Sequence, residues 1–232
     1  MTDPLSIDVP GIATVAALLT APHTPSACYV MAHGAGAGMT HPFMGAVASG
    51  LGARGIATLR YQFPYTQSGA RRPDRPPVAH ATVRAAIATA ARLMPGVPLI
   101  AGGKSFGARM TSQTQAASPL PGVAGLVAFG FPLHPAAKPS DERASHLSGI
   151  RVPMLFVQGD RDALAETRLL TSVMQRLNAQ ATLHLLPGAD HAFHVPARSG
   201  RTDDQVLAEA LDYVAEWLRV VLGGAPKAAR HI

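Results

Sequence analysis

The stretch Leu99-Ile100-Ala101-Gly102-Gly103-Lys104-Ser105-Phe106-Gly107 passes from an apolar run into a serine flanked by glycines. Its last five residues match the pattern G-x-S-x-G, in which the serine sits on a sharp turn between a strand and a helix. Glycines two residues to either side let the strand and the helix approach without clashing Cβ atoms. The pentapeptide alone is a weak signal, but an apolar run precedes it and a helical pattern follows it. We therefore predict that Ser105 is a nucleophile on a strand-to-helix turn.

Short apolar runs alternate with longer helical patterns on both sides of this turn. This alternation is typical of an α/β fold, a mostly parallel sheet with helices on both faces. We expect one domain over residues 1–222 and a disordered tail at 223–232. Strands are expected at 7–9, 12–19, 27–32, 55–61, 97–102, 123–130, 152–159 and 181–186, the first two as an antiparallel pair. Helices are expected at 43–53, 78–93, 108–116, 163–177 and 206–222.

The composition is that of a globular protein. Apolar residues make up 47% of the 232 residues and charged residues only 15%, which excludes a disordered or coiled-coil chain. No apolar run approaches the ~18–20 residues of a membrane span, so no membrane association is expected. Cys28 is the only cysteine, which favours a reducing cytoplasm. The formal net charge is +6, but the cations are scattered and aromatic residues are few, so we expect no nucleic-acid partner.

The sequence argues against a bound nucleotide or metal cofactor. Gly103-Lys104-Ser105 resembles the end of a phosphate-binding loop, but the first glycine of that motif would fall on Pro98. A dinucleotide-binding loop counted from Gly34 would need a small residue where Met39 stands. A metal site would lack evident cysteine and carboxylate ligands. Its histidine candidates would be His33, His41, His191 and His194.

Two side chains that can activate a serine hydroxyl follow Ser105 along the chain. Asp160-Arg161-Asp162 begins the loop after one predicted strand, and His191 lies in the loop after the next. The carboxyl ends of parallel strands meet at one edge of a sheet, so both loops should face the serine. We predict that His191 is the base and Asp162 the acid that orients it. Asp160 stays the alternative acid, because both carboxylates lie on one loop.

A glycine-rich turn, His33-Gly34-Ala35-Gly36, follows the predicted strand 27–32. A backbone amide in such a turn, together with the amide after the nucleophile, can stabilise the oxyanion of a tetrahedral intermediate. We expect the amides of Ala35 and Phe106 to form this oxyanion hole.

Aromatic and apolar side chains near the same sheet edge are candidates for a substrate pocket. Each of them could equally belong to the core. Only residues 131–151 separate two predicted strands where a lid domain could be inserted, so we expect an open pocket. Arg60, with Arg71, Arg72 and Arg75, could meet an acidic substrate. The other candidates are Met39, Phe43, Phe63, Tyr65, Phe131 and His134.

Six segments in this order resemble a small α/β-hydrolase group related to the dienelactone hydrolases: HGAGAGMTHPFM, RYQFPY, GGKSFGAR, GFPLHP, QGDRD and ADHAF. The resemblance extends from about Ala32 to Trp217. It implies the eight-stranded α/β-hydrolase fold and a triad of Ser105, Asp162 and His191. Dienelactone hydrolases carry a cysteine as the nucleophile on this strand-to-helix turn, where this chain has Ser105. Lactone chemistry is therefore not implied by the resemblance.

These features favour hydrolysis of a small-molecule carboxylic ester or thioester through an acyl-enzyme, without a cofactor. Peptidases, amidases and acyltransferases use the same machinery, and the sequence does not separate them. The alternative is a non-catalytic interaction module with the same fold. The presence of all three triad residues argues against it. The sequence determines neither the oligomeric state nor the role of Lys104.

Overall fold

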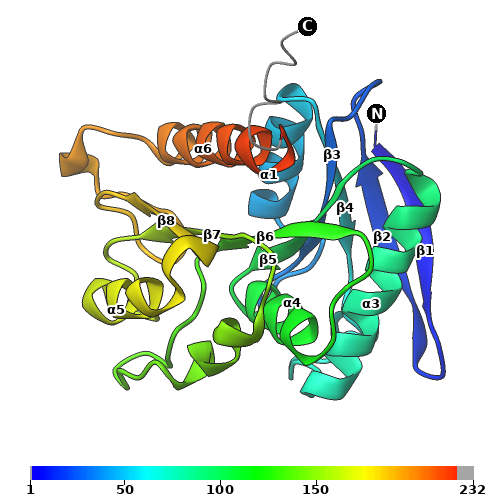
Figure 1. Ribbon diagram of the computed structural model, residues 1–232, viewed down its shortest axis with the longest axis horizontal. Coiled ribbons are helices and arrows are strands. Elements are labelled where there is room, and N and C mark those ends of the chain that lie inside the picture. The colour runs from blue at the N-terminus through cyan, green and yellow to red at the C-terminus, as the bar shows by residue number, and fades with distance from the viewer. Residues whose placement is uncertain (1, 224–232) are drawn as a thin grey trace, which may run out of the picture.

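One sheet of eight strands runs through the molecule (Figure 1). The computed structural model describes residues 2–223. The strands are β1 (Thr2–Val9), β2 (Ala13–Thr20), β3 (Ala27–Ala32), β4 (Ile56–Tyr61), β5 (Leu99–Lys104), β6 (Val123–Phe129), β7 (Met154–Gly159) and β8 (Ala181–Leu186). Their order across the sheet is β1-β2-β4-β3-β5-β6-β7-β8. β1 and β2 pair antiparallel, as do β2 and β4, and all other neighbours are parallel.

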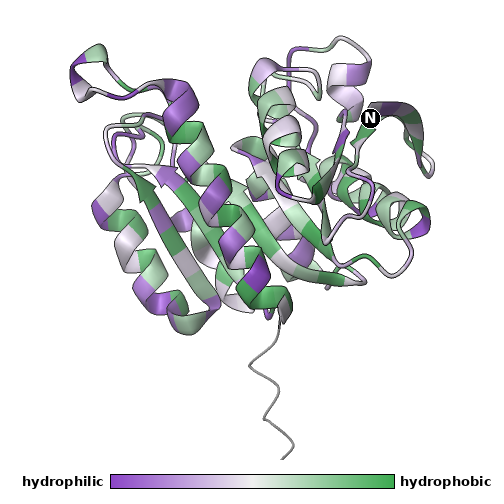
Figure 2. Ribbon diagram, turned by 90° about the horizontal axis from the view of Figure 1, so that it is seen from above, coloured by the Kyte–Doolittle hydropathy of each residue, from purple (hydrophilic) through white to green (hydrophobic). Residues whose placement is uncertain are grey.

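Helices cover both faces of this sheet. They are α1 (Pro42–Ala53), α2 (Pro64–Gln67), α3 (Pro76–Leu93), α4 (Phe106–Ala117), α5 (Thr167–Leu177) and α6 (Asp203–Gly223), with 3₁₀ helices at Glu142–Gly149, Asn178–Gln180 and Ala197–Ser199. α1 and α6 lie on one face, and α3, α4 and α5 on the other (Figure 1). Alternate residues of β3 serve the two cores: Val30 packs towards α3 and α4, and Tyr29 and Met31 towards α1 and α6. Apolar residues dominate the central strands, whereas α6 alternates between polar and apolar residues (Figure 2).

The strand order places a crevice at the carboxyl ends of β3 and β5. From β3 the chain continues to β4 on one side, and β5 then pairs with β3 on the other side. Ligands of open α/β sheets bind where the strand order reverses in this way. The glycine-rich turn after β3 and the turn at Ser105 after β5 therefore meet at this crevice.

The predicted α/β architecture is confirmed, including the antiparallel pair at the start of the chain, and several element bounds differ. β5 continues to Lys104, so the turn is confined to Ser105, and α4 begins at once with Phe106. α5 begins at Thr167 and not at 163, because Asp162 accepts hydrogen bonds from two following amides and forms a turn. Gly223 is the last residue of α6, not part of a tail, and residues 224–232 lie outside the described residues.

Cys28 is buried in the middle of the sheet, and burial raises the pKa of its thiol to about 12. Among residues 2–223 no helix has both the length and the apolar character to cross a membrane. The cytoplasmic location inferred from the single cysteine stays a prediction.

α4 packs so closely on the end of β3 that a side chain at Gly107 has no space. A Cβ at this position would lie 2.5 Å from the Ala32 carbonyl oxygen and 2.6 Å from that of His33. These are backbone atoms of a central strand and the loop it feeds, so they cannot move aside cheaply. Gly107 is therefore required by packing, even though glycine weakens a helix.

Gly107→Ala is expected to destabilise the protein by about 1–3 kcal/mol through overpacking, although alanine is the better helix former. Gly52→Ala in α1 is the control, because a Cβ there would meet nothing within 4 Å. It is expected to stabilise the protein by at most about 1 kcal/mol. Urea denaturation of both variants measures the two effects. Similar stabilities for the two variants would contradict the close packing of α4 on β3.

Candidate active site

Ser105 occupies a strained turn between β5 and α4. Its backbone angles are φ 51° and ψ −113°, and residues with a side chain rarely adopt such a positive φ. The Ser105 amide donates to the Phe129 carbonyl (3.0 Å), and the Arg109 amide donates to the Ser105 carbonyl (3.1 Å). This conformation presents the Ser105 hydroxyl at the carboxyl end of β5, as the G-x-S-x-G pattern predicts.

The side chains of Ser105, His191 and Asp162 form a chain of hydrogen bonds. His191 Nε2 lies 2.8 Å from Ser105 Oγ, and His191 Nδ1 lies 2.6 Å from Asp162 Oδ2. An ionised carboxylate only accepts hydrogen bonds, so Nδ1 carries the proton and Nε2 is left to accept from the serine hydroxyl. The structure thus brings together the three residues of the predicted triad in the geometry that activates a serine.

Asp162, and not Asp160, is the carboxylate that contacts the histidine. The Asp162 side chain is fully buried and also accepts from the Leu164 amide (2.7 Å). Asp160 turns to another loop, where its Oδ1 accepts from the Gly188 amide (2.8 Å). Of the two carboxylates, the structure places Asp162 and not Asp160 against His191.

A further partner of Asp162, Gln158, was missed by the sequence analysis. Gln158 is fully buried in β7, and its Nε2 donates to Asp162 Oδ2. The side-chain amide thereby helps to fix the carboxylate that faces His191. The signal available in the sequence was one polar residue within the otherwise apolar run Met154–Gly159.

The loop after β3 presents a backbone amide at the same sheet edge. The Gly34 carbonyl accepts from His33 Nδ1 (2.8 Å) and from the Ala37 amide (3.2 Å). Since the Gly34 C=O and the Ala35 N–H belong to one planar trans peptide, fixing the carbonyl directs the Ala35 N–H to the opposite side. Neither this amide nor that of Phe106 has an acceptor within residues 2–223. Both of the predicted oxyanion-hole donors are therefore available to a substrate oxygen.

His33 orients this loop as a neutral ring of one tautomer. Its Nδ1 donates to the Gly34 carbonyl, so its Nε2 is the nitrogen that accepts from the Phe63 amide (3.1 Å). The ring is fully buried, and this burial lowers the pKa of His33 and favours the uncharged form. His33 thus supports the Ala35 amide, a role that the sequence analysis did not assign to it.

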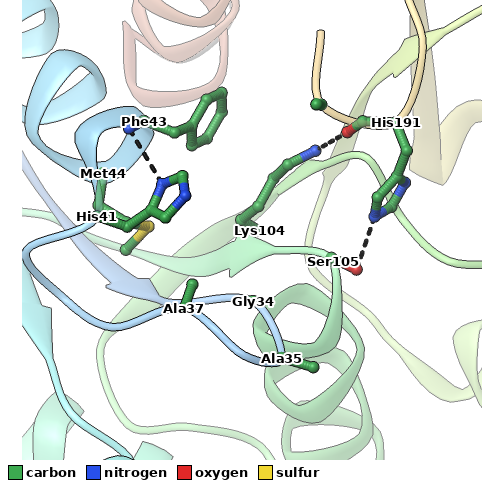
Figure 3. A pocket seen from close by; sticks show the side chains of 10 residues that line it. Gly34, Ala35, Ala37, His41, Phe43, Met44, Lys104, Ser105 and His191 are labelled. Carbon is green, nitrogen blue, oxygen red and sulfur yellow. Dashed lines mark hydrogen bonds between the residues drawn. The ribbon is translucent and has the colours of Figure 1, made fainter.

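A cavity of about 190 Å³ opens beside Ser105 (Figure 3). Lys104, Ser105 and His191 lie on one side, and His41 and Phe43 at the start of α1 lie opposite (Figure 3). The full lining is Gly34, Ala35, Ala37, His41, Phe43, Met44, Lys104, Ser105, His191 and Ala192. The cavity thus reaches both the nucleophile and the glycine-rich turn.

Of the ten residues considered as substrate-binding candidates, only Phe43 lines this cavity. Phe63, Tyr65 and Met39 are buried in and beneath the glycine-rich loop. The Phe63 backbone amide donates to His33 Nε2, and the Tyr65 hydroxyl accepts from the Gly36 amide (3.3 Å). The prediction was wrong for these three residues. A buried aromatic or apolar side chain can pack beneath a loop as readily as it can line the cavity that the loop borders.

Arg60 and His134 are also misassigned. The buried Arg60 guanidinium donates to the Met39 carbonyl (3.2 Å) and to Thr20 Oγ1 (3.3 Å), and it faces a different cavity. His134 Nε2 accepts from the Glu166 amide (3.1 Å), which ties the segment after β6 to the loop before α5. The remaining candidates Phe131, Arg71, Arg72 and Arg75 are likewise absent from the lining of the cavity beside Ser105.

The four histidines considered as metal ligands have other partners in this structure. His33 and His191 make the hydrogen bonds described above. His41 Nδ1 accepts from the Phe43 amide (3.2 Å), and His194 Nδ1 lies 2.9 Å from Asp203 Oδ2. In the described part of the chain no three His, Cys, Asp or Glu side chains are grouped so as to hold a metal ion.

Solved structures of low sequence identity share this fold. An alpha-beta serine hydrolase homologue from Coxiella burnetii has a TM-score of 0.75 and 20% identity, over 91% of this chain and 96% of that chain. XC6422 from Xanthomonas campestris, described as an a/b serine hydrolase without lid, has a TM-score of 0.74 and 22% identity, over 94% and 96%. A dienelactone hydrolase from Anabaena variabilis has a TM-score of 0.72 and 19% identity, over 94% and 96%.

At identities of 19–22%, the likeness to these three solved structures shows the fold alone. The match of the sequence to a family model is more specific. The model, described as an alpha/beta hydrolase domain, matches residues 25–219 and so spans every strand from β3 onwards. The match includes the turn at Ser105 (the elbow), the loop after β7 that bears Asp162 (the acid loop) and the loop after β8 that bears His191 (the histidine loop). The chain therefore belongs to the alpha/beta hydrolase domain family.

Proposed function

We propose that this protein is a serine hydrolase that cleaves small carboxylic esters or thioesters through an acyl-enzyme. The observation that carries the proposal is the continuous relay from Ser105 Oγ through His191 to the buried Asp162, with distances of 2.8 and 2.6 Å. The family to which the chain belongs supports hydrolase activity. A non-catalytic interaction module would have no use for a complete relay that opens into a cavity.

In the acylation step, His191 Nε2 takes the proton of the Ser105 hydroxyl while Oγ attacks the carbonyl carbon of the substrate. Asp162 holds the imidazole in the required tautomer and stabilises the imidazolium that forms. The tetrahedral intermediate collapses when His191 gives its proton to the leaving alcohol or thiol. Water then repeats the sequence on the acyl-enzyme and releases the acid.

The charge that develops on the substrate oxygen meets two backbone amides, those of Ala35 and Phe106. Phe106 is the first residue of α4, and the amino end of a helix carries partial positive charge. Each oxyanion donor of this kind contributes roughly 3–4 kcal/mol to transition-state stabilisation. Both donors are rigid, since one is held by the helix and the other by His33.

The size and lining of the cavity favour a small, largely apolar acyl group. A volume of about 190 Å³ is below the range of roughly 300–1,000 Å³ that is usual for sites of drug-sized ligands. Phe43, Met44 and Ala37 supply its apolar wall. Residues 130–153, between β6 and β7, do not line the cavity, and the 3₁₀ helix Glu142–Gly149 within them packs against α4. The cavity itself therefore limits the length of the acyl chain.

A fluorophosphonate probe is expected to label Ser105, because among residues 2–223 it is the one hydroxyl that lines the cavity and contacts a histidine paired with a carboxylate. Ser112 Oγ also lies 2.8 Å from a histidine, His146, but it does not line this cavity and is expected to stay unlabelled. Ser105→Ala abolishes the labelling by removing the nucleophile, and His191→Ala reduces it at least about 100-fold by removing the base. Peptide mass spectrometry identifies the labelled residue, and a cooperative melt shows that each variant is folded. Absence of labelling in the folded wild-type protein would refute the proposed function.

His33→Leu is expected to lower kcat about 100-fold with little change in KM, because it releases the peptide that carries one oxyanion donor. Thr66→Val is the matched control, since it removes only the longer contact between Thr66 Oγ1 and His33 Nε2 (3.4 Å). Steady-state kinetics on a neutral p-nitrophenyl ester measure both variants. A rise in KM with unchanged kcat would contradict the role assigned to His33.

The kcat/KM for p-nitrophenyl esters is expected to rise from acetate to butyrate and to fall for decanoate, whose chain exceeds the cavity. Ala37→Met narrows the cavity and is expected to reduce the rate for butyrate more than that for acetate. An initial-rate series over acyl length measures this preference. Undiminished turnover of long chains would show that the acyl group binds outside this cavity.

A further inference from the structure

Lys104 joins the nucleophile turn to the histidine loop. It is the last residue of β5, directly before Ser105, and its side chain extends towards the backbone of His191 (Figure 3). Its Nζ donates a hydrogen bond to the His191 carbonyl oxygen. The same ammonium lies over the rings of Phe193 and Phe43, at 4.4 and 5.3 Å from their centroids. Ser105 and His191 are therefore connected twice, once through their own side chains and once through Lys104, the residue next to Ser105.

The fold leaves space for this second link at Gly130, just after β6. A Cβ on Gly130 would lie 2.5 Å from Lys104 Nζ and 3.4 Å from the His191 carbonyl oxygen. Gly130 has a φ of +61°, a conformation that glycine adopts without strain. The absence of a side chain at this position is what allows the ammonium and the carbonyl to meet.

Stability alone does not account for an ammonium group at this place. Within residues 2–223 no carboxylate forms an ion pair with Lys104. Burial lowers the pKa of Lys104 to about 8, while the charges of Asp162 and Asp190 act in the opposite direction. A methionine would fill the same space without the cost of desolvating a charge.

Apart from the bond to Lys104, the hydrogen bonds at the start of the histidine loop connect its backbone to the acid loop and not to the turn at Ser105. The Asp160 carboxylate holds the Gly188 amide (2.8 Å), and the Ala189 carbonyl accepts from the Arg161 amide (2.9 Å). These bonds anchor the start of the loop to the acid loop. In the part of the chain that is described, the His191 carbonyl accepts from no backbone amide outside regular structure.

We propose that Lys104 is a positioning residue, which fastens the His191 carbonyl to the elbow and thereby sets the approach of His191 Nε2 to Ser105 Oγ. The proposal rests on the serine hydrolase function proposed above. Lys104 does not take or give a proton in the reaction. Its effect is geometric, and a displacement of about 1 Å between reacting groups can cost about 100-fold in rate.

The ionisation of Lys104 makes its role visible in the pH dependence of turnover. The ammonium form donates a charge-assisted hydrogen bond, which is stronger than the bond of a neutral amine. The charged groups that act on it are Asp162 and Asp190, and the two aromatic rings carry no charge. The titratable His191 imidazole lies beside the same position of Gly130, with its Cε1 3.5 Å from a Cβ placed there. As the pH rises through the Lys104 pKa of about 8, kcat is expected to decline.

The test compares Lys104→Met with Lys138→Met, which removes the same charge from an exposed loop position. For a neutral short-chain ester we expect Lys104→Met to lower kcat about 10- to 100-fold with KM nearly unchanged, since orientation and not binding is lost. The decline of kcat near pH 8 is expected to disappear in this variant. Lys138→Met is expected to match the wild-type protein in both respects.

Chemical rescue separates the ammonium from the packing of the side chain. Lys104→Cys is treated with 2-bromoethylamine, which places an amine on a thioether chain of nearly the length of lysine. Cys28 does not interfere, because it is buried and its thiol has a pKa of about 12. We expect recovery of kcat, with the decline at lower pH than in wild type, since the sulfur makes the amine less basic. Failure of the alkylated, folded protein to recover would overturn the proposal.

Two other outcomes would also overturn it. Unchanged kcat in Lys104→Met would show that the link is dispensable. A rise in KM confined to carboxylate-bearing esters, with kcat kept, would assign Lys104 to substrate binding and not to positioning.

Hydrogen exchange of the peptide covering residues 187–195 tests the link without any turnover. Lys104→Met is expected to accelerate exchange there relative to both wild type and Lys138→Met. Faster exchange in a protein that no fluorophosphonate labels would support the link while refuting the hydrolase function. Unchanged exchange in a protein that is labelled would refute the link alone.

Discussion

The contact between the Ser105 turn and the end of β3 is the constraint on which the rest of the structure depends. Gly107 lies so near the carbonyl groups of Ala32 and His33 that no side chain fits between them. The same contact brings the first turn of α4 next to the glycine-rich loop. One backbone junction therefore determines how near Ser105, the proposed nucleophile, lies to the Ala35 amide, a proposed oxyanion donor. The loops bearing Asp162 and His191 meet Ser105 at the same sheet edge.

Those loops lack the repeating backbone hydrogen bonds of helices and strands. Hydrogen bonds from polar side chains to the loop backbone fix their positions instead. His33 fixes the loop after β3, His134 ties the segment after β6 to the loop before α5, and Asp160 holds the start of the histidine loop. Gln158 and the Leu164 amide hold Asp162 in turn. A buried loop must satisfy its backbone groups individually, so a site built on loops needs many such supports.

This difference explains how far the sequence allowed prediction. The strands, the larger helices and the triad candidates could be predicted, because apolar periodicity and loop order along a parallel sheet are properties of the chain itself. Asp162 was preferred to Asp160 as the acid, but the alternative stayed open, since the two carboxylates are two residues apart and only the fold shows which one turns inward. Phe63, Tyr65 and Met39 were assigned to the pocket, because composition does not tell the inner side of a loop from its outer side. Lys104 could not be given a role either, since its partner is a backbone carbonyl 87 residues away.

The burial of Cys28 has a consequence for the chemistry that the protein can withstand. Oxidants attack thiolates, and the only thiol of this chain is enclosed in the sheet and held in its protonated form. The proposed nucleophile is a hydroxyl, which has no comparable ladder of sulfur oxidation states. A peroxide that would inactivate a cysteine nucleophile therefore has no thiol to oxidise at the proposed active site. Among the residues that line the cavity, the thioether of Met44 is the one sulfur that an oxidant could reach.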